Sequence, residues 1–160
     1  MFITSDPKDK VYKDLLDLAF SVCDEFILVV RSSISISNNV TDVLEKLYPF
    51  LKEKKEQSEW PGTKYFGKKS VIVYYYKTDE EAKRILLKFS NSLHSWVQPN
   101  LPEDLCFLKN QKPWLINTAH ERASYFDTDD KDEIEKIMNV ENLTVRKLNS
   151  LNHITQLSFK

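Results

Sequence analysis

Residues 71–96 read VIVYYYKTDEEAKRILLKFSNSLHSW and carry the two clearest secondary-structure signals of the chain. The six apolar and aromatic residues VIVYYY have the length of a strand, and an unbroken run of this kind is typical of a strand covered on both faces. Thr78 and Glu81 have the spacing of a helix capping box. Apolar side chains then recur at helical spacing as far as Trp96. The stretch therefore predicts a strand that leads into a helix.

The residues before this stretch predict two helices around another strand. Asp6-Pro7 is typical of a helix start, with Asp as the N-cap and Pro in the first turn. Phe26–Val30 is an apolar run of strand length, and the alternation in Ser32–Ser37 favours an extension or a second strand. Asn39 is expected to cap the next helix, and the charged run Lys52–Glu59 is interpreted as its solvated helical continuation.

The residues after this stretch favour antiparallel strands and a short helix. Leu105–Leu108 and Trp114–Asn117 flank the turn signal Asn110-Gln111-Lys112, which predicts a β-hairpin. Ala123–Phe126 is a candidate third strand, and Asp130 is expected to cap the last helix. The order predicts one α+β-like domain over 1–160, with a mixed sheet of about four to six strands flanked by helices.

The composition excludes several common enzyme classes. The net charge is −1, which argues against a strongly basic nucleic-acid binder. Only two glycines are present, Gly62 and Gly67, where average usage would give about 11. P-loops and dinucleotide-binding turns need glycines at spacings that this pair does not have, and G-x-S-x-G is absent. We therefore expect no nucleotide or nicotinamide cofactor.

The N-terminus and the cysteines indicate a cytoplasmic protein. The first residues lack a basic region followed by an apolar stretch, so no signal peptide is expected. The apolar runs are too short to span a membrane. Cys23 and Cys106 are isolated in apolar surroundings, which favours two buried thiols over a disulfide.

His120-Glu121 is the candidate for acid–base chemistry. His120 could act as a base if Glu103, Asp104 or Glu121 oriented it. The zinc-protease motif is absent, because Ser124 stands where a second histidine would be needed. The alternative interpretation, which we prefer, is a His-Glu corner that stabilises a turn between strands. Whether the Glu103-Asp104 and His120-Glu121 pairs meet in space stays open at this point.

Neither a metal site nor a cysteine nucleophile is expected. The histidines His94, His120 and His153 are scattered, and His94 is expected to be exposed. The hairpin would place Cys106 opposite Ile116, some 13 Å from His120 by strand rise, so Cys106 is interpreted as a buried apolar residue. The acidic stretch 127–133 lacks the glycine and the final glutamate of a calcium loop, and helix capping explains it.

The loop 60–70 is the preferred candidate for binding. It interleaves aromatic residues with lysines and contains both glycines, which points to a special backbone geometry. Aromatic rings and lysines could form a protein-binding hot spot or contact bases and phosphates, or the rings could simply pack inward. The candidate binding residues are Trp60, Pro61, Gly62, Lys64, Tyr65 and Phe66, together with Trp96 and Trp114.

A set of short motifs resembles one bacterial family. The motifs are Trp60-Pro61-Gly62-Thr63, Trp96-x-x-Pro99, Leu101-Pro102-Glu103-Asp104-Leu105, Trp114 and Ala119-His120-Glu121. Together they resemble a family of small uncharacterised proteins of spore-forming Gram-positive bacteria and their mobile elements, some labelled "stage III sporulation protein". The resemblance spans most of 26–126 and implies a single-domain cytosolic protein. It implies no reaction.

The leading hypothesis is a non-enzymatic interaction protein, such as an immunity or inhibitor protein that binds a protein partner. It follows from the missing catalytic motifs, the size of the chain and the aromatic loop. The alternative is a small hydrolase that uses His120 with Glu103, Asp104 or Glu121 as acid and base groups. A nucleic-acid reader that uses Tyr65, Phe66 and the lysines is disfavoured by the net charge.

Overall fold

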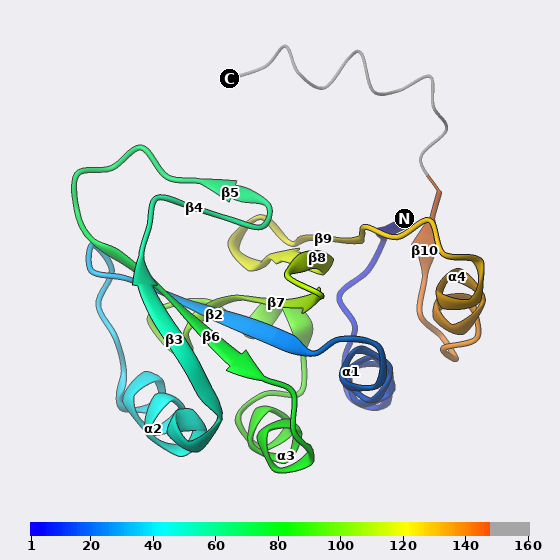
Figure 1. The fold of residues 1–160 in the computed structure, drawn as a ribbon, viewed down its shortest axis with the longest axis horizontal. Coiled ribbons are helices and arrows are strands. Elements are labelled where there is room, and N and C mark those ends of the chain that lie inside the picture. Colours follow the sequence, from blue (N-terminus) through cyan, green and yellow to red (C-terminus); the bar gives the residue numbers. More distant parts are fainter. Residues whose placement is uncertain (148–160) are drawn as a thin grey trace.

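The computed structural model describes residues 1–147 and shows one large antiparallel sheet (Figure 1). Its eight strands have the order β10-β1-β9-β8-β7-β2-β6-β3, and every pairing between them is antiparallel. A separate two-stranded hairpin, β4-β5, lies outside this sheet. The strands are β1 (Phe2–Ile3), β2 (Glu25–Arg31), β3 (Leu51–Glu56), β4 (Glu59–Trp60), β5 (Thr63–Lys64), β6 (Val71–Lys77), β7 (Glu103–Lys109), β8 (Lys112–Thr118), β9 (Ala123–Phe126) and β10 (Val145–Arg146).

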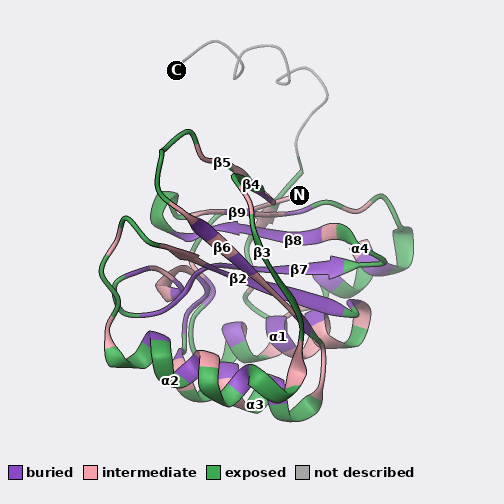
Figure 2. Cartoon of the chain, turned by 60° about the vertical axis from the view of Figure 1, so that its left-hand side comes forward, coloured by how far each residue is buried: buried purple, intermediate pink, exposed green. Residues whose placement is uncertain are grey.

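Three helices cover one face of the sheet, and the β4-β5 hairpin lies over the other (Figures 1 and 2). The helices are α1 (Lys10–Val22), α2 (Asn38–Leu47), α3 (Glu80–Phe89) and α4 (Lys131–Met138), with single 3₁₀ turns η1 (Tyr48–Phe50), η2 (Leu93–Ser95) and η3 (Ala119–Glu121). Helix α4 packs beside α1, and α3 contacts both α1 and α2.

The two faces of the sheet have separate apolar clusters. The larger cluster lies between the sheet and the helices and includes Phe26, Phe107 and Trp96. The smaller cluster lies on the opposite face, where Trp60 of the hairpin packs with residues such as Ile27 and Cys106. Because the smaller cluster is closed by the hairpin, the position of the hairpin is fixed by packing rather than by strand pairing with the large sheet.

The predicted class is confirmed, but the sheet is larger than expected and antiparallel rather than mixed. Two of the additional strands, β1 and β10, are two residues long, too short to leave a pattern. The charged run Lys52–Glu59 was predicted to continue a helix, and this is wrong, because most of it forms β3. As an edge strand exposed along most of its length, β3 needs no apolar alternation, so its sequence resembles a solvated helix.

Several predicted boundaries also need correction. Helix α1 starts at Lys10 rather than at Asp6-Pro7, and Asp6 accepts hydrogen bonds from Ser92 Oγ and the His94 backbone instead. The segment Ser32–Ser37 forms no strand. Helix α3 ends at Phe89, well before Trp96.

The C-terminal half agrees more closely with its sequence. The hairpin of β7 and β8 turns at Asn110 and Gln111, which both have positive φ, as a tight hairpin turn requires. Strand β9 matches the predicted Ala123–Phe126. Asp130 caps α4 by accepting a hydrogen bond from the Glu133 backbone, which confirms capping as the role of this acidic residue.

Candidate functional site

The Glu103-Asp104 and His120-Glu121 pairs do meet. The hairpin of β7 and β8 folds back on itself, so the first residues of β7 lie against the 3₁₀ turn that follows β8. Metal-ligating atoms of Glu103, Asp104 and His120 all lie within 4.8 Å of one another. The convergence that the hydrolase alternative required is therefore present, and the partners of each side chain decide what it can do.

Glu103 is held by Arg31, the last residue of β2. Its Oε2 accepts from Arg31 Nε at 2.6 Å and lies 2.5 Å from Arg31 Nη2. Strands β2 and β7 are neighbours, and Val29 pairs with Glu103, which places the two side chains at the same end of the sheet. Glu103 is 1% exposed, so this is a buried, charge-assisted contact. The Glu103 carboxylate therefore links β7 to Arg31 of β2 and is occupied by this ion pair.

Asp104 connects three separate parts of the chain. Its Oδ2 accepts from Trp60 Nε1 of β4 at 2.9 Å, and its Oδ1 accepts from the Ala119 backbone N–H of η3 at 2.9 Å. Burial raises the pKa of Asp104, although these two hydrogen bonds oppose the shift. Its φ is 57°, a left-handed conformation that costs energy for an aspartate. These contacts indicate an anchoring role.

His120 is the accessible member of the group. Its Nδ1 lies 3.4 Å from Arg31 Nη2, and because an arginine can only donate, Nδ1 accepts in this contact. Its Nε2 lies 3.7 Å from Glu121 Oε1 at the surface. Glu103 and Asp104 are bonded elsewhere, so Glu121 is the carboxylate that is left to orient His120.

Glu103, Asp104 and His120 are also the described residues that could hold a metal ion as a group of three. Carboxylate and imidazole ligands suit zinc or other first-row transition metals. The Arg31 guanidinium, however, already contacts both Glu103 and His120. A metal ion would have to displace this cation, so the arrangement fits an internal arginine better than it fits a metal.

The candidate binding loop is anchored below and exposed at its tip. We call residues 59–70, which comprise β4, β5 and the segment leading to β6, the recognition loop. Trp60 points inward and is only 4% exposed, contrary to a direct surface role. Gly62, at the turn, has φ 80°, and a Cβ there would lie 2.7 Å from Ile116 Cγ2 and Thr118 Oγ1. The special geometry expected of this glycine is thus confirmed.

The exposed part of the loop carries one aromatic residue among lysines. Tyr65 is half-buried and packs against the smaller apolar cluster. Phe66 is 84% exposed, and Lys64 Nζ lies 5.7 Å from its ring centroid. Lys68 and Lys69 follow and are exposed as well. Of the aromatic residues expected to bind, Phe66 is therefore the one that is fully available.

Trp96 and Trp114 belong to the core rather than to a binding surface. Trp96 donates from Nε1 to the hydroxyl of Tyr12 at 2.9 Å, and Trp114 donates from Nε1 to Glu133 Oε2 at 2.8 Å. Both are essentially buried. Their inclusion among the predicted binding residues is corrected: each is a large apolar side chain whose N–H has found a buried partner.

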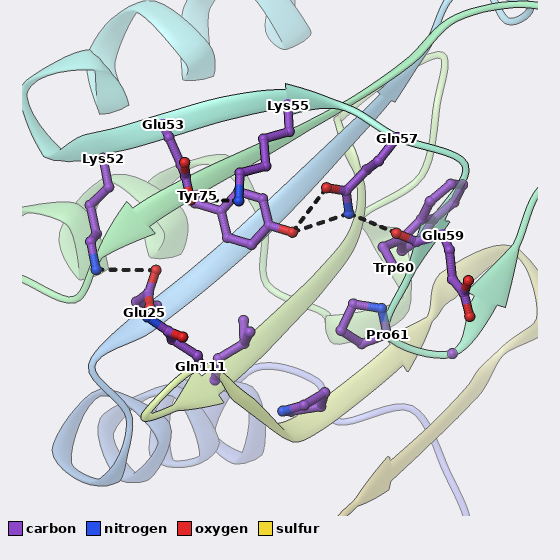
Figure 3. Close-up of a pocket in the computed structure, with 13 residues that line it drawn as sticks. Glu25, Lys52, Glu53, Lys55, Gln57, Glu59, Trp60, Pro61, Tyr75 and Gln111 are labelled. Atoms are coloured by element: carbon purple, nitrogen blue, oxygen red, sulfur yellow. Dashed lines mark hydrogen bonds and ion pairs between the residues drawn. The ribbon is translucent and has the colours of Figure 1, made fainter.

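A groove that the sequence did not predict lies on the face of the sheet opposite the helices, which we call the open face, beside the β4-β5 hairpin (Figure 3). It has a volume of about 700 Å³ and lies between β3 and the wall formed by Trp60 and Pro61. Tyr75 lines it, so the predicted strand of residues 71–76 is covered only in part on this face. The groove was missed because the lysines and glutamates of β3 were assigned to a helix. Its charged lining is Glu25, Lys52, Glu53, Lys55 and Glu59.

The remaining candidate residues are structural. Cys23 and Cys106 are free and buried, and burial raises the pKa of both thiols, which makes them poor nucleophiles. His94 was expected to be exposed, but its side chain is buried, with Nε2 3.0 Å from Ser124 Oγ. Burial lowers its pKa. His153 lies outside the residues that the structure describes.

Comparison with models of protein families, with curated proteins and with solved structures found no match to this chain. The resemblance to a family of bacterial proteins therefore stays a prediction. In residues 1–147, no helix has the length and apolar character needed to cross a membrane.

Proposed function

We propose that the chain is a non-enzymatic protein-binding module of the bacterial cytosol, of the immunity or inhibitor type, and that its recognition loop contacts the partner. The observation that carries the proposal is the contrast within this loop. Its base is buried and hydrogen-bonded, whereas Phe66 at its tip is 84% exposed. A large apolar side chain held out by a fixed base loses little entropy on binding, which is typical of a hot-spot residue.

The surroundings of Phe66 indicate the chemistry of the partner. Lys64, Lys68 and Lys69 are exposed and close to it in sequence. Residues 61–70 contain no acidic residue. An apolar centre with a charged rim matches the usual anatomy of protein interfaces. The partner surface that fits has an apolar socket surrounded by carboxylates, because complementary charges speed association and select the partner.

A protein partner fits the loop better than a nucleic acid does. Stacking on bases needs aromatic platforms, and here Trp60 faces inward and Tyr65 is half-buried. One available ring and three lysines, on a chain with net charge −1, give a small basic footprint. A nucleic-acid ligand is an outcome that the following experiment would reveal.

The experiment is a pull-down from cells that encode this chain, followed by mass spectrometry, with the wild type, Phe66→Ala and Tyr48→Ala compared. Tyr48 is the matched control, because it is also an exposed aromatic, at 72%, and lies in η1 outside the recognition loop. We expect one stoichiometric protein that is retained by Tyr48→Ala and lost with Phe66→Ala.

A second variant tests the charged rim. Lys64→Glu should weaken the purified complex more than tenfold, as measured by calorimetry, since it reverses one of the rim charges. Retention of the partner by both Phe66→Ala and Lys64→Glu would place the contact elsewhere and overturn the assignment of the loop. Recovery of nucleic acid without a protein would overturn the proposed class of partner.

One observation favours a second candidate function, a small hydrolase. Glu103, Asp104 and His120 converge, as acid–base chemistry would require. Against it, Glu103 is bonded to Arg31, and Asp104 is bonded to Trp60 and Ala119, which leaves His120 with Glu121 at the surface. Screening the purified protein against ester, amide and phosphodiester substrates tests this candidate. Turnover that disappears in His120→Ala but persists in His94→Gln would establish it.

A further inference from the structure

We propose that β3 pairs with β3 of a second copy of this chain, in antiparallel orientation, with Lys54 opposite Lys54 of the second copy. This inference does not depend on the proposed function. Strand β3 ends the order of the large sheet, and no strand of the described residues pairs with its outer edge. A six-residue edge strand presents unpaired backbone groups, which are a template for another strand.

The backbone determines which residues of β3 can hydrogen-bond across this edge. The Gln57 backbone N–H, directly after β3, donates to the Val71 carbonyl of the inner neighbour at 3.1 Å. Because successive residues of a strand direct their backbone groups to opposite sides, Glu53 and Lys55 also bond inward, toward β6. Lys54 and Glu56 therefore present their N–H and C=O groups to the free edge. Self-pairing must join residues of this second kind.

The charges then favour one register. Lys52 lies at the register shift between Leu51 and Glu53 and is already paired with Glu25 at 3.2 Å, so the regular part of the strand begins at Glu53. With Lys54 on the twofold axis, Glu53 lies opposite Lys55 of the second copy, and symmetry repeats this Glu–Lys pair. These pairs fall at the non-hydrogen-bonded positions, where Cα atoms are only about 4.5 Å apart, while the two Lys54 residues meet at the wider spacing of about 5.5 Å. With Lys55 on the axis this spacing is reversed, and with Glu53 on the axis Glu53 lies against itself, so the axis at Lys54 is the best of the three.

Hollows flank β3 on both faces of the sheet. On the open face, Figure 3 shows Glu53 and Lys55 in the groove beside Tyr75, where they form an ion pair of 3.1 Å. In the dimer the same two residues and their copies would form a ring of alternating charges. On the helix face, a second hollow of about 650 Å³ flanks β3 and is lined by residues of α2, β3 and β6 that include Leu44, Lys54 and Tyr74.

The lysines of β3 have two effects. They oppose pairing with unrelated edge strands, which is how natural sheets avoid aggregation. In the proposed register Lys55 faces Glu53 of the second copy, and the two Lys54 side chains on the axis remain a repulsive pair. We therefore expect a reversible dimer that tightens when Lys54 is replaced by an uncharged strand-former such as threonine.

The first experiment is sedimentation velocity on the purified full chain over a range of concentrations. The wild type should show a reversible monomer–dimer equilibrium. Glu53→Lys and Lys55→Glu should each weaken it about tenfold, because each makes two cross-strand pairs repulsive. The double variant Glu53→Lys/Lys55→Glu should restore dimerisation. Both side chains are about half exposed, so these variants are expected to fold.

The second experiment fixes the register. A cysteine at position 54 would lie opposite its own copy, so Lys54→Cys should form a disulfide-linked dimer on mild oxidation. Lys55→Cys should not, and the native Cys23 and Cys106 are buried. Crosslinking through position 55 instead would overturn the register. A chain that stays monomeric at all concentrations, or a double charge swap that fails to restore the dimer, would overturn the proposal.

Discussion

Trp60 Nε1 donates to Asp104 Oδ2 at 2.9 Å, which joins the recognition loop to the start of strand β7. The two residues are 44 positions apart in the sequence. The other oxygen of Asp104 holds η3, and the Arg31 guanidinium lies 5.9 Å from the Trp60 ring centroid. Asp104 and its neighbour Arg31, which surround a candidate catalytic group, therefore hold the base of the recognition loop in place.

The first prediction concerns this hydrogen bond. Trp60→Phe keeps an aromatic ring in the smaller apolar cluster but removes the N–H donor and part of the buried volume, which leaves a buried Asp104 oxygen without this partner. We expect a loss of about 1–3 kcal/mol in the free energy of unfolding. Hydrogen exchange of backbone amides in the recognition loop should accelerate, as measured by mass spectrometry. Glu59→Gln, an exposed change in the same hairpin, is the control, and equal protection in both variants would contradict the anchoring role.

The second prediction concerns the Arg31–Glu103 pair. Arg31→Met leaves the buried Glu103 carboxylate without its cation, so the free energy of unfolding should fall by about 3–5 kcal/mol. Adding Glu103→Gln removes the stranded charge and should recover part of this loss. Chemical denaturation of the single and double variants measures both effects. Additive losses would show that the two residues do not act as a pair.

The third prediction concerns Gly62. Gly62→Ala adds a Cβ 2.7 Å from Ile116 Cγ2 and Thr118 Oγ1, at a backbone φ of 80°. Both the conformation and the crowding are unfavourable, so we expect a loss of at least about 1–3 kcal/mol, seen as a lower Tm. Gly62→Asn separates the two causes, because asparagine tolerates positive φ but has the same Cβ. If Gly62→Asn is as stable as the wild type, crowding is not the cause.

The fourth prediction concerns pH. Burial lowers the pKa of His94 below 6.5 despite the nearby Asp6, so the unfolded chain takes up a proton on this residue more readily than the folded chain does. The stability that depends on neutral His94 is therefore complete above pH 6.5 and declines as the pH falls below it. Denaturation curves at pH 7.5 and 5.5 should show a larger drop in the free energy of unfolding for the wild type than for His94→Gln.

Local signals predicted the elements whose cause is local. The β7-β8 hairpin follows from Asn110 and Gln111 at its turn, and α4 begins where Asp130 can cap it. Strand β6 follows from its unbroken apolar run. These features depend on neighbouring residues, so one sequence is sufficient to find them.

The features that depend on distant residues could not be found in this way. The inward position of Trp60 depends on Asp104, and the exposure of Phe66 depends on the direction in which that base points the loop. Likewise, β3 is a strand because its backbone pairs with the edge of β6. Its own residues favour a helix as strongly as they favour a strand. Its role as the last strand of the sheet, and the groove beside it, follow only from the sheet order.

The recognition loop is divided into a buried base, which is bonded to the rest of the fold, and a tip whose side chains are exposed. Replacing the side chains at positions 64, 66, 68 and 69 leaves the hydrogen bond of Trp60 to Asp104 and the close packing of Gly62 against Ile116 and Thr118 intact. Such changes alter the exposed surface at little cost in stability. Under the function proposed above, the same fold would therefore accept loop tips of different charge and shape without loss of its anchor.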